Sequence, residues 1–408
     1  MPSSALSIRM PCSIRGRPFR PCTAAQNLAP CTYIKGNCRI PNWNGFDPRQ
    51  MQHQSMNEDR RESLQASVIE ASGSQTPLNI IAGNSKAFYG RTAHGQTLPI
   101  EDHRGIVDYS PTELVITARA GTRLSELESI LEEEGQVLPF EPPHFGEGAT
   151  IGGTLVCGLS GPSRPYTGSI RDYVLGVDCL GGNGKLMSFG GQVMKNVAGY
   201  DLSRFLTGSL GTLAIVLEAT LRVMPRPGAS LTLVQDADPA TAIERFNRWA
   251  GLPLPITAAC ACENKLYVRL SGTRQGVLDA RTRLDGDALE DDGRFWSDIR
   301  EHRHPFFTAD RPLWRLSIPA GTRPLKIDGT WLYDWGGAQR WLSSDISAGQ
   351  IRQAASNAGG HATLFRGGDR DSDVFHPLPP ALFRLHKNLK ESFDPAGILN
   401  PGRMYTDL

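Results

Sequence analysis

The sequence predicts a protein of the α+β class with strands and helices in more than one domain. Short apolar runs bounded by glycine and proline, at 78–81 and 213–223, have the length and residue types of buried strands. The segment 124–134 instead repeats leucine and isoleucine at helical spacing. A chain of 408 residues is too long for one simple core, so about two or three domains are expected.

Residues 1–56 differ in composition from the rest of the chain. They are rich in arginine and proline, contain no acid before Asp47, and lack hydrophobic periodicity. Three interpretations stay open: a disordered tail or a mis-set start codon, a targeting segment, and a functional arm. Met51 and Met56 stand just before the first helix-like segment, which favours the first interpretation.

Charge and hydropathy exclude two classes of function. The formal net charge is +1, whereas surfaces that follow nucleic-acid phosphates need clustered Lys and Arg, so no nucleic-acid partner is expected. No apolar run approaches the ~18–20 residues that span a bilayer, so no transmembrane segment is expected either.

The cysteines give no sign of a metal site. Four of the eight precede residue 40, and no two of these are spaced as Cys-x-x-Cys, which argues against a zinc or iron–sulfur site. Cys157 and Cys179 lie among small apolar residues and are expected to be buried thiols. The pattern fits a reducing compartment without disulfides. The four early cysteines are Cys12, Cys22, Cys31 and Cys38.

The first domain, 57–226, begins with a helix predicted within 57–71 and the strand 78–81. The strand runs into 82–86, a loop of small residues that could present N–H groups to an anion or be a plain turn. A second strand is predicted at 113–118.

The helix predicted at 124–134 has identifiable ends. Thr122 is expected to cap its start and Gly135 to end it. Acids in its last turn oppose the helix dipole, so this end should lie on the surface.

The stretch 142–223 is the most informative part of the chain. Glycine is dense in its loops, beside small hydroxyl residues, and lets backbone N–H groups approach a phosphate closely. Strands are predicted at 173–180 and 185–189, joined by a glycine-rich hairpin turn, and at 213–223. The Gly-x-Gly-x-x-Gly and Walker A motifs are both missing, so the two commonest nucleotide folds are disfavoured.

Residues 227–408 predict a second α+β domain, where most of the tryptophans lie. We interpret these tryptophans as core or subunit-interface anchors. The expected strands include 230–234, 265–270 and 313–318, and the expected helices are 239–250, 346–358 and 378–392.

Three loops and the C-terminus together resemble a known family. The loops are 82–86 (Ala-Gly-Asn-Ser-Lys), 146–161 and 191–202, and the chain closes with Asp-Pro-Ala-Gly-Ile-Leu-Asn-Pro-Gly at 394–402. From about residue 60 onward the sequence resembles the vanillyl-alcohol-oxidase, or PCMH-type, flavoproteins, and within them the FAD-binding subunits of bacterial glycolate oxidases. This resemblance implies a two-lobed FAD-binding domain followed by a smaller, cap-like α+β domain.

The resemblance also implies which residues contact FAD. Lys195, Tyr200 and Arg204 are left open, because 200–202 reads equally well as the start of a helix. The implied contacts are Gly83, Asn84, Ser85 and Lys86 in the first loop, Gly148, Thr150, Gly152 and Gly153 in the second, Gly158 and Ser160 further along the cleft, and Ile215 near the flavin ring.

The second domain gives no complete set of catalytic residues. Related D-2-hydroxy-acid oxidases are expected to carry His-x-x-Asp-Gly-Asn and Glu-His-Gly segments there, and neither occurs in this chain. His302 and His304 are expected on a polar loop, and His361 is expected to be a hydrogen-bonded structural histidine. Catalytic residues are therefore not assigned, and no metal site is expected.

The resulting hypothesis is an accessory or electron-relaying FAD subunit of a complex that oxidises glycolate to glyoxylate. The implied partners are a catalytic FAD subunit and an iron–sulfur subunit, in the cytoplasm or held at the inner membrane through those partners. Two alternatives stay open: a self-sufficient FAD-dependent D-2-hydroxy-acid dehydrogenase, and a scaffold subunit without cofactor.

Overall fold

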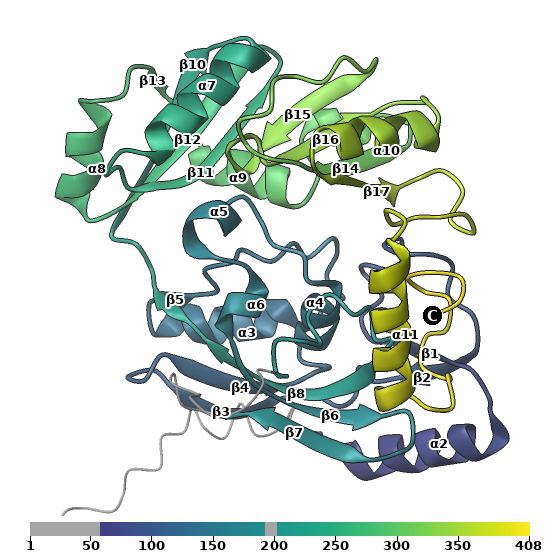
Figure 1. Ribbon diagram of the computed structural model, residues 1–408. Coiled ribbons are helices and arrows are strands. Elements are labelled where there is room, and N and C mark those ends of the chain that lie inside the picture. Colours follow the sequence, from purple (N-terminus) through teal and green to yellow (C-terminus); the bar gives the residue numbers. More distant parts are fainter. Residues whose placement is uncertain (1–57, 192–201) are drawn as a thin grey trace, which may run out of the picture. The chain divides into compact units, whose positions relative to one another are not determined.

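The computed structural model describes residues 58–191 and 202–408. These residues belong to one unit, Pro48–Leu408. Within it, one sheet has five strands and another has eight, and two further sheets are pairs of short strands (Figure 1). This mixture of strands and helices confirms the predicted α+β class. The extension 1–56 and most of the predicted third loop lie outside the described residues.

The five-stranded sheet is antiparallel throughout, in the order β3-β4-β8-β6-β7. Its central strand β8 is buried along nearly its whole length, as its run of Val, Leu, Ile and Ala predicts. The predicted hairpin between β6 and β7 is confirmed. The strands are β3 (Ile106–Ser110), β4 (Val115–Arg119), β6 (Val174–Gly181), β7 (Leu186–Gly190) and β8 (Ala214–Arg222).

Helices α3 (Leu124–Glu133) and α4 (Ile151–Cys157) pack into the same core as this sheet. The apolar side of α3 buries Leu124, Leu127 and Leu131 completely, which is the outcome its helical spacing predicts. The acids at its C-terminal end are exposed, as expected. Two one-turn helices, α5 (Arg164–Thr167) and α6 (Ile170–Tyr173), follow α4.

The prediction that Thr122 caps α3 is wrong. The capping position is Arg123, and no side chain caps the helix there. The Thr122 hydroxyl instead accepts a hydrogen bond from the Gly105 N–H (2.9 Å) and donates one to the Gly105 carbonyl (3.1 Å). A nearby backbone pair therefore satisfies this hydroxyl, and the sequence around Thr122 does not reveal that competitor.

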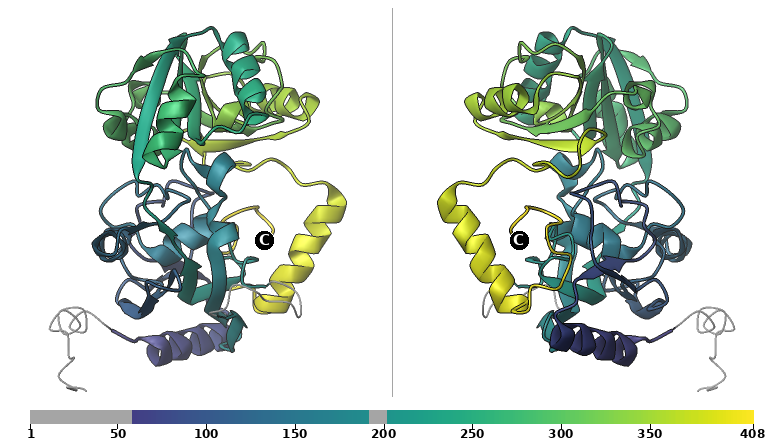
Figure 2. Two further views of the ribbon diagram at one scale, coloured as in Figure 1. Left: turned by 90° about the vertical axis from the view of Figure 1, so that its left-hand side faces the viewer. Right: turned by 90° about the vertical axis from the view of Figure 1, so that its right-hand side faces the viewer.

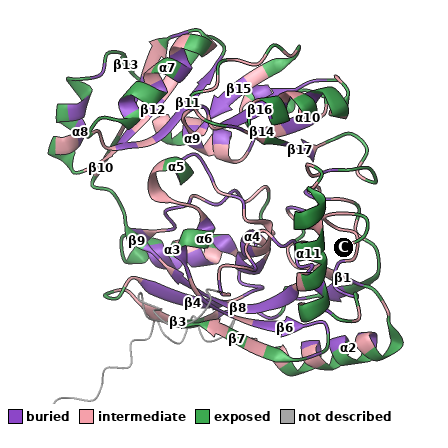
Figure 3. Cartoon of the chain, in the orientation of Figure 1, coloured by how far each residue is buried: buried purple, intermediate pink, exposed green. Residues whose placement is uncertain are grey.

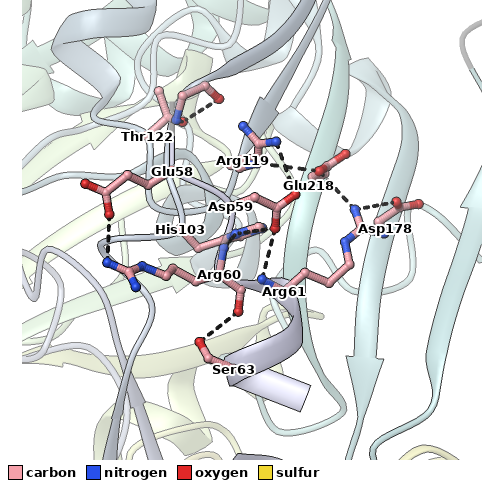
Figure 4. Close-up of polar contacts among 11 residues, drawn as sticks. Glu58, Asp59, Arg60, Arg61, Ser63, His103, Arg119, Thr122, Asp178 and Glu218 are labelled. Atoms are coloured by element: carbon pink, nitrogen blue, oxygen red, sulfur yellow. Dashed lines mark hydrogen bonds and ion pairs between the residues drawn. The ribbon is translucent and has the colours of Figure 1, made fainter. Parts of the chain in front are cut away.

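Helix α2 (Arg61–Ser74) is tied to the five-stranded sheet by ionic contacts at its start (Figure 4). Arg61 lies 3.2 Å from the carboxylate of Asp178 on β6 and 2.9 Å from that of Glu218 on β8. Arg119 on β4 pairs with Asp59 at 3.2 Å. Segment 59–61 is thus held to three strands of the sheet. The strand pair after α2, β1 (Leu78–Ile81) and β2 (Gln96–Pro99), is parallel, and β1 has the predicted bounds. A second short pair joins β5 (Gln136–Val137) and β9 (Met224–Pro225).

The eight-stranded sheet has the order β13-β10-β12-β11-β15-β16-β14-β17, and its neighbouring strands pair antiparallel. Four tryptophans on or beside it, Trp249, Trp296, Trp314 and Trp341, are buried, which confirms them as core residues. The strands are β10 (Ala229–Asp236), β11 (Ile256–Cys262), β12 (Lys265–Gly272), β13 (Asp287–Ala288), β14 (Leu313–Ser317), β15 (Thr330–Asp334), β16 (Gln339–Ser343) and β17 (His361–Arg366).

Helix α7 (Pro239–Ala250) has the predicted bounds, and local chemistry explains where it starts. The Asp238 carboxylate accepts hydrogen bonds from the N–H groups of Ala240 (2.9 Å) and Thr241 (3.1 Å), while Pro239 occupies the first turn. The other helices here are α8 (Arg274–Arg281), α9 (Asp292–Arg300) and α10 (Ala348–Asn357), with 3₁₀ turns at Pro305–Thr308 and Trp335–Gly337.

After β17 the chain returns to the five-stranded sheet through α11 (Pro380–Phe393) and the tail 394–408 (Figure 2). Ile398 and Leu399 are buried in the core of that sheet, and Leu399 forms a parallel bridge with Leu78. Most of α11 itself is exposed (Figure 3). The last residues of the chain therefore complete the core that the first strands begin. No helix of the described residues is long and apolar enough to cross a membrane.

Candidate cofactor site

The first and second glycine loops cross with their backbones in contact. A Cβ on Gly83 would stand 1.2 Å from the carbonyl oxygen of Gly148, and a Cβ on Gly148 would stand 2.2 Å from that of Gly83. No other residue fits at either position without moving a backbone. The density of glycine in these loops therefore has a steric cause as well as the expected one of exposing N–H groups.

The second loop leads into α4, and the start of α4 packs closely against Ala120. A Cβ on Gly152 would lie 2.6 Å from the Cβ of Ala120, and the Gly152 N–H donates to the Ala120 carbonyl (2.9 Å). The Thr150 hydroxyl caps α4 by accepting from the Gly153 N–H (3.2 Å). The loop is thus held rigidly against the end of β4.

The crossing loops border a cavity of about 560 Å³. Most of the residues that the sequence singles out meet at it, although they come from β8 and two separate loops. Gly158 and Ser160 are not brought to it: Gly158 ends α4 with a left-handed backbone, and Ser160 lines a different, small cavity. Those at the larger cavity are Gly83, Asn84, Ser85, Lys86, Gly148, Thr150, Gly152, Gly153 and Ile215.

The charged side chains that line the cavity, among the described residues, are all cationic. No Asp or Glu is among the described residues that line it, but four cationic side chains are. They are Lys86, Arg91, Arg370 and Arg403. The sequence had led us to expect N–H and hydroxyl donors with few charges. The sequence analysis did not assign Arg370 and Arg403 to the site, because both lie in the second half of the chain, far in sequence from the two loops that border the cavity.

Lys86 is buried beside the cavity. Its ammonium donates to the His144 carbonyl at 3.3 Å, and burial lowers its pKa although Cys157 and Glu301 act in the opposite direction. Burial raises the pKa of the Cys157 thiol, and raises that of Cys179 to about 12. Both cysteines are free; Cys179 is buried as expected, whereas Cys157 is half-buried.

The expectation of a polar loop at His302 is wrong. Its imidazole is buried and stacks on Phe307 at 3.9 Å between ring centroids, with Trp341 at 4.6 Å and Phe145 at 5.0 Å. Burial lowers the pKa of His302 well below its usual value, and Arg366 and Arg315 lower it further. The flanking residues Arg303 and Pro305 suggested a polar loop, whereas the chain turns this one side chain into an aromatic cluster.

The other two histidines are more exposed. The His304 ring accepts from the Phe306 N–H at 3.3 Å and caps a 3₁₀ turn. His361 is exposed at the start of β17, and its side chain has no hydrogen-bond partner among the described residues, contrary to expectation. Residues 58–191 and 202–408 contain no group of three His, Cys, Asp or Glu that could hold a metal ion.

A second cavity, of about 20 Å³, lies against His302. Arg300, Arg315 and Asp334 also border it, together with aromatic rings of the cluster around His302. The volume is that of about one water molecule. In this conformation the cavity is too small for an organic acid.

Fold and site together define the class: this is an FAD-binding protein of the PCMH type. Residues 59–190 match the family described as FAD binding domain. A longer match decides the narrower family: glycolate oxidase subunit GlcE of Escherichia coli (strain K12) is 49% identical over 350 residues, 86% of this chain and 99% of that protein. The chain belongs to the family of glycolate oxidase GlcE subunits.

Other similarities are partial or concern the fold alone. Glycolate oxidase subunit GlcD of Bacillus subtilis (strain 168) is 33% identical over 143 residues, 35% of this chain and 30% of that protein. D-lactate dehydrogenase of Archaeoglobus fulgidus is 34% identical over 145 residues, 34% of this chain and 32% of that protein. A solved structure of alkyldihydroxyacetonephosphate synthase has a TM-score of 0.58 at 15% identity, covering 83% of this chain and 74% of that one.

The residues present fit FAD. No side chain fits at Gly83 or Gly148, where the two loops touch, and the cations that line the cavity match a doubly charged pyrophosphate. Bound FAD supplies two-electron chemistry, which no side chain of the site can provide alone. That the individual residues singled out in the loops contact FAD stays a prediction.

Proposed function

We propose that this chain is the FAD-carrying subunit of a complex that oxidises glycolate to glyoxylate, and that it relays electrons or supports a catalytic flavin subunit. This role does not require the chain itself to bind glycolate. The family membership supports the complex, since the relative that is 49% identical is named a glycolate oxidase subunit. The partners we propose are a catalytic FAD subunit similar to GlcD and an iron–sulfur subunit. We further propose that the complex works in the cytoplasm, free or at the inner membrane through those partners.

One observation carries the accessory role. Oxidising a 2-hydroxy acid requires a cation for its carboxylate and a base for its hydroxyl proton. In the second half of this chain, Arg315 and His302 border one cavity, but only about 20 Å³ is open there. His302 has its Nδ1 without a hydrogen-bond partner among the described residues, and burial, with two nearby arginines, lowers its pKa, so it is a weak base. Space and the weak basicity of His302 both argue against glycolate turnover in this small cavity.

Reduction of the bound flavin by glycolate tests the proposal. The FAD-loaded chain, purified without partners, is mixed anaerobically with glycolate or D-lactate while the flavin absorbance is followed. We expect no bleaching, whereas dithionite should bleach the same sample fully. Adding the partner subunits should then allow glycolate to bleach this flavin as well. Rapid bleaching of the isolated chain would contradict the accessory role.

The second candidate is a self-sufficient D-2-hydroxy-acid dehydrogenase. The shared cavity of Arg315 and His302 favours it, because a guanidinium and an imidazole are the side chains that this reaction uses. This candidate predicts bleaching by substrate alone, and loss of that bleaching in both Arg315→Lys and His302→Gln. If bleaching survives both changes, the reaction takes place elsewhere on the chain.

A further inference from the structure

We propose that Arg403 and Arg370 are positioning residues of the FAD site: they hold the backbone of residues 87–91 at the wall of the cavity and place positive charge beside the pyrophosphate. The inference rests on FAD occupying the cavity of about 560 Å³, as the proposed function requires. Neither residue lies in the segment 59–190 that matches the FAD-binding family.

Arg403 binds three carbonyl groups of one loop. Its Nη2 donates to the carbonyls of Ala87 (2.7 Å) and Tyr89 (2.8 Å), and its Nη1 donates to that of Arg91. Arg91 returns the contact, since its N–H donates to the Arg403 carbonyl (2.9 Å) and its Nε to the Gly402 carbonyl (3.0 Å). Loop and tail are thus joined by reciprocal hydrogen bonds across more than 300 residues of sequence.

Arg370 holds the same loop from another side. Its Nε and Nη2 donate to the Gly90 carbonyl, at 3.1 and 2.6 Å, and its Nη1 donates to the Leu364 carbonyl at 2.8 Å. The guanidinium therefore links the loop to strand β17. Residues 82–90 contain only turns and bends, so these arginines supply bonds that the loop cannot make within itself.

Both guanidinium groups lack an ion-pair partner within the described residues, because every acceptor they have is a neutral carbonyl. Burial and the neighbouring Arg403 lower the pKa of Arg370 to about 10, and burial lowers the pKa of Arg403. Both stay charged near neutral pH. With no acid lining the cavity, a pyrophosphate dianion would supply the missing negative charge.

Arg340 shows what an arginine with a purely structural role looks like in this chain, and it provides a matched control. It is fully buried and donates to the carbonyls of Gly337 (3.1 Å), Arg323 (3.0 Å) and Thr322. It does not line the cavity. Arg340→Lys should lower stability without altering how FAD affinity depends on salt.

The test measures FAD affinity of the full-length chain at several salt concentrations, by flavin fluorescence after removal of bound FAD. Arg403→Gln removes both the positive charge and the planar guanidinium group. It should raise the Kd for FAD about 10- to 100-fold and make that Kd less dependent on salt. Arg403→Lys and Arg370→Lys keep the charge but lose the planar fork, so they should weaken affinity less and retain the salt dependence. Affinity for riboflavin, which has no phosphate, should change less than affinity for FAD in Arg403→Gln.

Each outcome decides something. If Arg403→Gln binds FAD within threefold of the native chain with unchanged salt dependence, the proposal fails. If Arg403→Gln does not fold, Arg403→Lys and Arg370→Lys decide: native affinity in both would overturn the positioning role. Gly83→Ala separates failure of the proposed FAD site from failure of the arginine role. If Gly83→Ala weakens FAD binding and the arginine variants do not, FAD binds at this cavity but the arginines do not position it. If Gly83→Ala also leaves affinity unchanged, FAD binds elsewhere.

Discussion

The carbonyl oxygen of Gly148 occupies the position at which a side chain on Gly83 would begin. The separation from an added Cβ is 1.2 Å, well inside the contact distance of any two atoms that are not bonded. The two loops that border the cavity thus determine each other's path, although 64 residues of other structure separate them in sequence.

Replacing Gly83 by alanine should push the two loops apart and weaken FAD binding at least tenfold. The physical reason is that the added methyl group must displace the backbone of Gly148, and backbone cannot rotate away as a side chain can. Titration of the apo-protein with FAD measures the effect. Gly349→Ala is the control: nothing lies within 4 Å of that position in α10, so it should leave affinity unchanged and stabilise the helix by about 0.5–1 kcal/mol.

Asn400→Ala should destabilise the protein by about 1–3 kcal/mol. The Asn400 side chain accepts from the Ile80 N–H (2.8 Å) and donates to the Leu210 carbonyl (2.8 Å), so alanine leaves two polar backbone groups without partners. Urea unfolding measures the loss. Asn388→Ala, on the exposed side of α11, should change the unfolding free energy by less than about 0.5 kcal/mol. Equal losses in the two variants would show that the Asn400 contacts contribute nothing specific.

Lys390→Met should cost about 3–5 kcal/mol of stability, because it leaves a buried carboxylate without its cation. The Lys390 ammonium donates to Asp394 (2.7 Å) and to the carbonyls of Thr212 (2.8 Å) and Leu399 (2.6 Å). Adding Asp394→Asn to Lys390→Met removes the unpaired charge and should restore part of the loss. The four unfolding free energies form a double-mutant cycle, and strict additivity would contradict a buried ion pair.

His103 should make the protein less stable as the pH falls from about 6.5 toward 4. Burial lowers its pKa from 6.5 to about 4, with Asp59 opposing and Arg119 and Arg61 adding to the shift. The folded state keeps the ring neutral, with Nδ1 accepting from the Arg60 N–H at 3.0 Å (Figure 4). Below pH 6.5 the unfolded chain takes up a proton that the folded chain does not, so the stability present above that pH is progressively lost.

Unfolding free energies of the native chain and His103→Gln, each at pH 7 and pH 5, measure this effect. The native chain should lose about 1–2 kcal/mol more than the variant between the two pH values. His94→Gln replaces an exposed histidine and should retain the native pH dependence. The same pH dependence in all three proteins would show that His103 is not the responsible group.

Local sequence patterns predicted much of the secondary structure but did not predict the tertiary contacts. Strand 78–81 and helix 239–250 have the predicted bounds, because apolar run length and capping chemistry act within a few residues. Most of the predicted loop residues also meet at one cavity, since a recognisable family pattern orders them. By contrast, the burial of His302 depends on Phe307, Trp341 and Phe145, which lie on three separate segments. No spacing near residue 302 encodes that packing.

Three of the four cations of the cavity, Arg91, Arg370 and Arg403, were missed for a related reason. Arg403 reaches Tyr89 across 314 residues, and Asn400 reaches Ile80 across 320. The Asn-Pro-Gly sequence at 400–402 is recognisable as part of a family pattern, but the sequence does not reveal which residues this segment contacts. Contacts of this range follow from the packing of the whole chain, which propensity and periodicity do not describe.

Because the tail packs against the first loop, the wall of the cavity can be completed only late in the synthesis of the polypeptide. A ribosome that adds about 5–20 residues per second needs roughly 15–60 s to proceed from Tyr89 to Arg403, a distance of 314 residues. During that interval the glycine loops exist without the arginine that holds them. A chain that stops before Arg403 would therefore keep every glycine of the FAD-binding segment but lack the side chain that holds residues 87–91 at the cavity wall.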